Sequence, residues 1–257
     1  MKELLYALPG GGKPPPPAWG LTPVHMTYRI TPSLRLTGVR LTEGVRGGGM
    51  FIACPGDVES ADPTFCCRQV AGECRRRGFD RVICDVESLP SPTLTRLIQA
   101  LGNTCTQNGL ALYLPEAFAS SAPECRVLVS SVVVSGMLQR RLERAAEKYG
   151  RERVVLAVEA AAEDFLLPAS GRGTHLTAEQ LRALMTRLKP AVFFDRGLCA
   201  HYFTYMAGGG RAHFVLFDSP RSVQEKLSAA QAAGIPSALL AAPQVEGWME
   251  EILGTET

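Results

Sequence analysis

Two carboxylates spaced two residues apart, Asp85 and Glu87, are the strongest candidates for chemistry in this chain of 257 residues. They end the apolar run RVICDVE at 81–87, whose length and composition predict a β-strand. Side chains of a strand alternate between its two faces, so Ile83, Asp85 and Glu87 share one face. The opposite face is wholly apolar and carries Val82, Cys84 and Val86. The sequence therefore predicts two neighbouring carboxylates at the carboxyl end of one strand.

A carboxylate pair of this kind is suited to acid–base catalysis. Burying the two groups together costs desolvation and mutual repulsion, and a proton held by one of them at neutral pH relieves both. A pair that shares a proton provides a general acid and a helper. The alternative that the residues leave open is a structural pair whose carboxylates are satisfied by arginine or by backbone donors.

The rest of the chain predicts a barrel that positions this strand. From residue 50 onward, short apolar runs alternate with amphipathic stretches, the pattern of βα units around a parallel sheet. We expect one domain, 1–257, folded as a (β/α)8 TIM-type barrel, with Asp85 and Glu87 pointing inward at the end where such barrels build active sites. The expected strands are 50–56, 81–87, 110–115, 126–134, 153–159, 213–217 and 236–242.

Explicit start and stop signals bound most of the expected helices. Three segments place a capping side chain before a proline, which suits the first helical position: Asp62-Pro63, Ser91-Pro92 and Ser219-Pro220. Gly78, Gly150 and Gly234 suit the helix ends. Thr177 and Gln180 have the spacing of a capping box. Two buried helix faces are expected: Leu94, Leu97, Ile98 and Leu101, then Leu181, Leu184, Met185 and Leu188.

The first 49 residues are expected to be a divergent part of the barrel. The runs 2–8 and 24–30 predict two more strands, but the segments after them are rich in Pro and Gly and carry no convincing helix signal. Together with these two runs, the expected strands are one more than the wall of a (β/α)8 barrel contains. One of 213–217 and 236–242 is therefore expected outside the wall, and we place the insertion within 160–217, before the last strand.

Composition and charge limit the kinds of partner that the protein is expected to bind. A net charge of +2, with 20% charged residues, gives no global field that would recruit nucleic acid or an anionic membrane. The basic cluster Arg75–Arg77 ends a predicted helix, where cations complement the helix dipole, a better account than a phosphate site. The GGG triplets at 10–12, 47–49 and 208–210 favour turns over phosphate loops, because none has the required strand and helix around it.

Cysteine usage and the amino terminus indicate a reducing compartment. The eight cysteines contain no CxxC pair or His/Cys cluster of zinc-ligand spacing, so no metal is predicted and they are interpreted as small buried hydrophobes. The first residues have no long apolar segment of a signal peptide, and no later segment reaches the roughly 20 apolar residues that span a bilayer. These patterns predict a cytoplasmic, non-membrane protein.

The acidic strand resembles a family signature. Asp80, Asp85 and Glu87 match the first, third and fourth acidic positions of DxxDxDxE, the signature of the family-18 glycoside hydrolases. The segment 199–243 resembles the closing region of that family, with an insertion strand, a Phe-Asp turn, a Ser-x-x-x-Lys helix and the final strand. The segment 153–168 resembles the penultimate strand and its tail. The resemblance covers roughly 50–243 and is closest to bacterial spore-cortex N-acetylglucosaminidases.

The resemblance implies a substrate-assisted mechanism. Glu87 would protonate the glycosidic oxygen while the acetamido carbonyl of the sugar attacks the anomeric carbon, the exception to the usual scheme with two catalytic carboxylates. Asp85 would orient the acetamido group and stabilise its developing positive charge. Asp80 would be a structural partner at the start of the strand. The implied substrate is a polymer of β-linked N-acetylglucosamine, as in peptidoglycan or chitin, and no metal or organic cofactor is required.

Several positions depart from the family pattern. Ile83 replaces the second acidic position, and Arg81 places a cation low in the barrel, where it could pair with an acid and lower its pKa. The family's Met-x-Tyr-Asp strand end, which carries a substrate-binding tyrosine, aligns with Val132 and Val133, and its tryptophan floor aligns with Ala241. These losses predict reduced, altered or absent hydrolysis. Three other acids near strand ends are candidates for a rebuilt substrate pocket, or else ordinary loop acids: Glu116, Glu159 and Asp218.

Three functions remain open at this stage. The first is a glycosidase with Glu87 as the acid. The second is a catalytically impaired barrel that binds carbohydrate or a protein partner as a scaffold, with a possible spore or cell-envelope role. The third is an unrelated barrel enzyme for a small phosphorylated substrate, which needs a Gly-rich phosphate site after the seventh and eighth strands, and neither Asp218–Pro220 nor Pro243–Val245 resembles one. The oligomeric state is not predicted.

Overall fold

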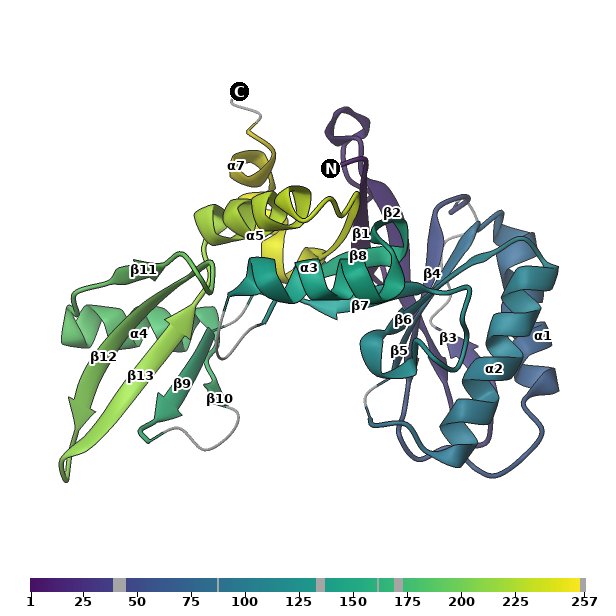
Figure 1. Ribbon diagram of the computed structural model, residues 1–257, viewed down its shortest axis with the longest axis horizontal. Helices are drawn as coiled ribbons and strands as arrows, with labels where there is room; N and C mark the ends of the chain where they lie inside the picture. Colours follow the sequence, from purple (N-terminus) through teal and green to yellow (C-terminus); the bar gives the residue numbers. More distant parts are fainter. Residues whose placement is uncertain (39–44, 87, 133–136, 161, 169–172, 255–257) are drawn as a thin grey trace.

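Eight parallel strands close into a barrel in the computed structural model (Figure 1), as the sequence predicted. The structure describes residues 1–257 except 39–44, 87, 133–136, 161, 169–172 and 255–257. The hydrogen-bonded order of the wall is β1-β14-β8-β7-β6-β5-β4-β2, and pairing of β1 with β2 closes it. The wall strands are β1 (Glu3–Pro9), β2 (Thr22–Ile30), β4 (Gly49–Cys54), β5 (Arg81–Val86), β6 (Ala111–Pro115), β7 (Arg126–Ser130), β8 (Val154–Val158) and β14 (Ser237–Ala241).

The amino-terminal part of the barrel is irregular, which confirms the prediction from its Pro and Gly content. Between β1 and β2 lies only a 3-10 helix, η1 (Pro17–Trp19), whose Trp19 packs partly against the main core. After β2 the described chain forms β3 (Leu36–Gly38), which pairs antiparallel with β2 outside the closed wall. The described residues contain no α-helix before α1.

Helices separate most of the other wall strands, whereas β6 and β7 are joined through a 3-10 turn without an α-helix. The helices are α1 (Thr64–Arg77), α2 (Pro92–Gln107), α3 (Leu138–Tyr149), α5 (Pro220–Ala232), α6 (Ala242–Val245) and α7 (Met249–Leu253), with the 3-10 turns η2 (Glu116–Phe118), η3 (Arg151–Arg153) and η4 (Glu246–Trp248). Ser91 and Ser219 cap α2 and α5, and Gly78 ends α1 at a φ of 67°. Asp62 was expected to be the N-cap of α1, but Pro63 occupies that position. Asp62 lies one residue before the N-cap, and its carboxylate accepts a hydrogen bond from the Thr64 amide at 3.0 Å.

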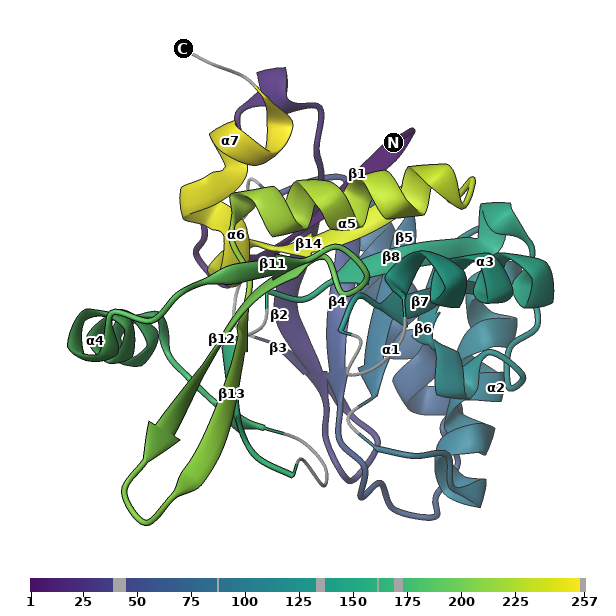
Figure 2. The same ribbon diagram turned by 60° about the vertical axis from the view of Figure 1, so that its left-hand side comes forward.

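A five-stranded antiparallel sheet is inserted between β8 and α5 (Figures 1 and 2), so the run 213–217 is the strand that lies outside the wall. Its order is β10 (Thr174–His175), β9 (Ala162–Leu166), β13 (Arg211–Phe217), β12 (Ala200–Ala207) and β11 (Phe193–Asp195). Helix α4 (Ala178–Leu188) packs on one face through the predicted apolar stripe, and its capping box from Thr177 and Gln180 is present. We call this sheet with α4 the insertion.

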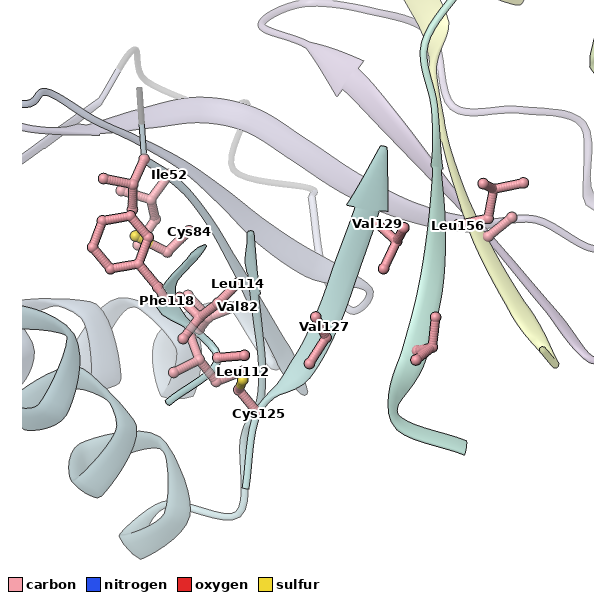
Figure 3. Close-up of a cluster of buried hydrophobic side chains, with 14 of the residues drawn as sticks. Ile52, Val82, Cys84, Leu112, Leu114, Phe118, Cys125, Val127, Val129 and Leu156 are labelled. Atoms are coloured by element: carbon pink, nitrogen blue, oxygen red, sulfur yellow. The ribbon is translucent and has the colours of Figure 1, made fainter. Parts of the chain in front are cut away.

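The two faces of the wall strands pack in two different hydrophobic cores. This arrangement confirms the alternation predicted for 81–87. Val82, Cys84 and Val86 belong to the outer core between wall and helices, where Figure 3 shows Val82 and Cys84 among other buried apolar side chains. Ile83 belongs to the inner core inside the barrel. Full burial of one such aliphatic side chain stabilises the fold by about 1.5 to 3 kcal/mol, so this register is strongly specified.

All eight cysteines are free and buried, as predicted. Burial raises the pKa of the Cys66, Cys74 and Cys105 thiols to about 12, which makes them unreactive packing residues. In the described part of the chain, no cluster of three His, Cys, Asp or Glu side chains has a geometry that fits a metal ion. Among the same residues, no helix has the length and apolar character needed to cross a bilayer.

Candidate active site

The candidate site lies at the carboxyl ends of the wall strands, a region that we call the mouth. Asp85 stands there on β5, on the same face of the strand as Ile83 of the inner core, so its side chain points inward. It is partly buried and pairs in register with Ala53 of β4. Glu87, the predicted acid, lies outside the described residues. The prediction that Asp85 faces the barrel interior agrees with the strand geometry.

Small side chains occupy several inward positions around the mouth. Ala53 on β4, Ser130 on β7 and Ala241 on β14 each follow by two residues an inner-core side chain of the same strand, and Ala157 of β8 packs against the inner core. Ala241 stands where the resemblance had placed a tryptophan floor. Val132, the described half of the Val132–Val133 replacement, is partly buried just beyond β7, and Val133 lies outside the described residues. The mouth therefore presents few large apolar groups at these positions.

The predicted cation low in the barrel is present, and it is engaged at the opposite end from the mouth. The Arg81 guanidinium donates to Asp80 at 2.6 Å and also to Glu3 of β1. These bonds raise the pKa of Arg81 and lower the pKa of Asp80. Arg81 and Asp85 are four residues apart on one strand, or roughly 13 Å. Arg81 therefore pairs with Asp80 and Glu3, at the amino end of β5.

Gly49 explains how a long cation fits at that end. It pairs in register with Arg81 across β4 and β5, and a Cβ added to Gly49 would collide with the methylene stem of Arg81. Arg126 of β7 lies over the Tyr113 ring of β6, with 5.7 Å between the guanidinium carbon and the ring centroid. The amino end of the barrel is thus filled by paired and stacked side chains. Asp80 lies among them as a partner of Arg81, in the position expected of a structural acid.

Glu159 is an exposed acid at the mouth, and hydrogen bonds from three other segments hold its backbone. Its amide donates to Ser131 Oγ at 3.0 Å, and its carbonyl accepts from Lys226 Nζ at 3.1 Å. The next amide, of Ala160, donates to Gln244 Oε1 at 3.1 Å. Glu159 follows β8 in phase with the inward residue Ala157. A carboxylate on such a fixed backbone is suited to contact a substrate at the mouth.

Asp218 is sealed inside the protein rather than open to a substrate. Its side chain is 1% exposed and accepts from Lys226 Nζ at 2.7 Å, and the Lys226 side chain is 2% exposed. Since Lys226 also binds the Glu159 carbonyl, this ion pair joins the end of the insertion, α5 and the rim of β8. Asp218 is therefore placed as a support of the mouth and offers almost no surface to a sugar.

Glu116 is placed on the outer side of the wall. It begins η2 after β6, where its carboxylate accepts from Tyr149 Oη at 3.4 Å and lies 3.5 Å from Arg141 of α3. It lines an open cavity of about 640 Å³ together with Lys148, Tyr149 and Arg153. Its position beside α3 separates it from Asp85 and Glu159. Of the three candidate acids for a rebuilt pocket, only Glu159 is exposed at the mouth.

The polar residues that fix the backbone around the mouth were not predicted from the sequence. Ser131 and Lys226 fix the backbone of Glu159, and His201 of β12 contacts Ser219 Oγ at 3.0 Å, which ties the insertion to α5. Burial and the nearby Arg221 lower the pKa of His201, favouring the neutral imidazole. One signal was available in the sequence: Lys226 shares a helix face with Val223, Leu227 and Ala230, and a buried cation there requires an acidic partner.

Comparison with known proteins identifies the fold. No family model matches the chain, and no curated protein matches its sequence. Solved structures do match. The chitinase of Chromobacterium violaceum superposes with a TM-score of 0.69 and 16% identity, covering 100% of both chains. The spore cortex-lytic enzyme SleL of Bacillus cereus gives 0.65 and 14%, covering 97% of this chain and 74% of that one.

The chain has the fold of these enzymes. A third structure, the class V chitinase of Nicotiana tobaccum in complex with NAG4, gives a TM-score of 0.67 and 11% identity over 99% of each chain. The coverage includes both the barrel and the insertion, so the shared architecture is not limited to the wall. The fold expected from the resemblance to family-18 glycoside hydrolases is confirmed.

Proposed function

We propose that the chain acts on polymers of β-linked N-acetylglucosamine at the mouth of its barrel, with Glu87 as general acid. The observation that carries the proposal is the inward Asp85 at the carboxyl end of β5, in a fold shared with chitinases and a cortex-lytic enzyme. Active sites of such barrels are built at this end. Peptidoglycan and chitin are the substrate types to which the related structures point.

Asp85 and Glu159 have distinct roles in this proposal. Asp85 orients the acetamido group of the bound sugar and stabilises positive charge as its carbonyl attacks the anomeric carbon. Glu87 gives its proton to the glycosidic oxygen, so the bond to the leaving sugar breaks as the oxazolinium ring forms. Water then opens that ring, returning the proton to Glu87. The exposed carboxylate of Glu159, on its fixed backbone, contacts hydroxyl or amide groups of the sugar chain.

Release of reducing ends from chitohexaose and from peptidoglycan fragments tests this proposal. Glu87→Gln removes the transferable proton while keeping size and hydrogen bonding, and we expect kcat to fall about 10²- to 10⁴-fold. The matched control is Glu124→Gln, an exposed acid before β7 at the amino end of the barrel, which should retain wild-type turnover. Wild-type protein that releases no product from either substrate between pH 4 and 8 would exclude the hydrolase.

The small side chains at the mouth favour a second candidate, a glycan-binding barrel without turnover. Ala241 and Val132 stand where the resemblance had placed a tryptophan and a tyrosine, so two aromatic contacts to the sugar are missing. Each such contact is worth on the order of 1 to 3 kcal/mol. Under this alternative, chitohexaose binds with the same Kd to wild-type protein and to Glu87→Gln, and neither protein shows turnover.

A further inference from the structure

The chain that follows β1 contains four consecutive prolines, 14–17, directly after Lys13. Proline fixes its own φ near −65° and pushes the residue before it to extended dihedrals, so this run is expected to form a polyproline II helix. Pro16 has a φ of −53° and a ψ of 135°, close to that conformation. We call residues 13–17 the proline segment.

The proline segment is fixed at both ends and open along its length. The Gly12 amide donates to the Pro9 carbonyl at 3.0 Å, and the Trp19 amide donates to the Pro16 carbonyl at 3.0 Å. Trp19 itself is partly buried against the outer core. Within the segment Pro15 is partly buried and the other four side chains are exposed. Such a preformed helix loses little entropy on binding, which makes it a recurring ligand of aromatic-lined surfaces.

The insertion sheet has a surface of this aromatic type on its face opposite α4. Phe193, Tyr202 and Phe214 contact one another across β11, β12 and β13, with successive ring centroids 5.5 Å and 5.3 Å apart. Their neighbours Phe203 and Val215 pack on the other face with α4, which Figures 1 and 2 show on one side of the sheet. We call the three rings the aromatic strip.

The outer end of the aromatic strip is open to a partner. Phe193 lies on the edge strand β11 and is 54% exposed. An exposed apolar group on an edge strand is costly unless another chain or segment covers it.

A single row of side chains crosses the strip and ends in an acid. The register pairs Phe193 with Tyr202, Tyr202 with Leu216, and Leu216 with Glu163. Neighbouring strands lie about 4.8 Å apart, so Glu163 on β9 is roughly 14 Å from Phe193 on β11. Glu163 is partly exposed, so the row joins an aromatic surface to a carboxylate.

The proline segment has the length and the charge to lie along this row. A polyproline II helix has three residues per turn and rises about 3.1 Å per residue, so Pro14 and Pro17 share one face about 9 Å apart. That separation is close to two strand spacings, which places Pro17 over β11 and Pro14 over β13. Lys13 then stands over β9, where its ammonium group pairs with the Glu163 carboxylate.

We propose that two copies of the chain associate, with the proline segment of each copy lying on the aromatic strip of the other. Both surfaces are exposed in the single chain, so they are not docked on each other within one molecule. The segment follows the carboxyl end of β1 and the insertion follows the carboxyl end of β8, so both belong to the mouth end of the barrel. A two-fold axis in front of the mouth therefore allows both contacts at once and closes the dimer.

Sedimentation velocity over a range of protein concentrations tests the dimer. Wild-type protein should shift from monomer to dimer as its concentration rises. Phe193→Ala should raise the dimer Kd about tenfold or more, because each dimer loses the same aromatic contact twice. Pro14→Ala combined with Pro17→Ala should act in the same direction. The matched controls are Phe65→Ala, at a ring 45% exposed on α1, and Pro123→Ala, at an exposed proline before β7, and neither should change the Kd.

A charge exchange tests whether the two surfaces are partners. Lys13→Glu and Glu163→Lys should each weaken the dimer, because each places like charges opposite one another. The two changes in one chain restore an opposite-charge pair and should recover most of the association.

The dimer is wrong if wild-type protein stays a monomer at every concentration, or if the Phe193 and proline variants associate as the wild type does. A doubly exchanged protein that associates no better than either single variant would also reject the pairing. None of these results depends on hydrolysis at the mouth, so turnover of the dilute monomer tests the proposed function separately.

Discussion

The two ends of strand β5 differ in what their polar residues do. At the amino end, Arg81 is bonded to Asp80 and Glu3 and fits against Gly49. At the carboxyl end, Asp85 stands among small side chains such as Ala53. The paired charges at the amino end stabilise the fold, and the Asp85 carboxylate points inward at the end where barrels of this type bind their ligands. One strand therefore combines a stabilising end and a candidate catalytic end, as expected for barrels of this type.

The mouth of the barrel also contains a stabilising pair, the buried Lys226 and Asp218. Lys226→Met should lower the free energy of unfolding by about 3 to 5 kcal/mol, because it removes the cation buried against the Asp218 carboxylate. Urea unfolding measures the change. Lys226→Met combined with Asp218→Asn should be more stable than Lys226→Met alone, and equal stability of the two would show that the lysine does not act through this acid.

Breaking the amino end should affect stability and leave binding intact. Arg81→Met keeps most of the side-chain length but removes the guanidinium, and we expect a loss of about 1 to 3 kcal/mol in the free energy of unfolding. Affinity for chitobiose should not change in the folded variant, since Arg81 is engaged with Asp80 and Glu3. Loss of sugar binding at temperatures where the variant is folded would contradict the separation of the two ends.

The smallest expected effect concerns acid pH. The hydrogen bonds from Arg81 hold the pKa of Asp80 below its usual range, so this pair contributes stability that is present above the unfolded pKa, about 3.9, and is lost as pH falls through the lower folded value. The urea midpoint of the wild type should therefore fall more steeply below about pH 4 than that of Asp80→Asn. Parallel curves for the two proteins would show that Asp80 contributes nothing to acid sensitivity.

Much of the fold was predictable because its signals are local. The alternation of Val82, Ile83 and Cys84 fixes which face of β5 meets the helices, and a shift of one residue would bury Asp85 among apolar groups. The proline-preceded caps and the Thr177 capping box set helix starts by contacts within four residues. The sequence left undecided which of 213–217 and 236–242 joins the wall, because both are short apolar strands.

The candidate site was less predictable, because contacts with residues elsewhere in the chain determine whether each of its acids is buried or exposed. All three candidate acids follow apolar strands, yet their surroundings differ. Glu116 faces α3, Glu159 is exposed at the mouth, and Asp218 is buried against Lys226. Arg141 lies 25 residues from Glu116 in the chain. Lys226 lies 67 residues from Glu159 and 8 residues from Asp218. Strand position alone contains no information about such pairings.

The most direct test compares Asp85→Asn with Asp80→Asn, two equivalent changes at opposite ends of one strand, in kcat on chitohexaose and in Tm. We predict that Asp85→Asn lowers kcat by about 10²-fold or more with little change in Tm, because the anion that stabilises the reacting acetamido group is lost. Asp80→Asn should keep its turnover and lower Tm by about 2 to 4 °C for each kcal/mol of lost stability. Full turnover in Asp85→Asn, or loss of turnover in a folded Asp80→Asn, would contradict this account.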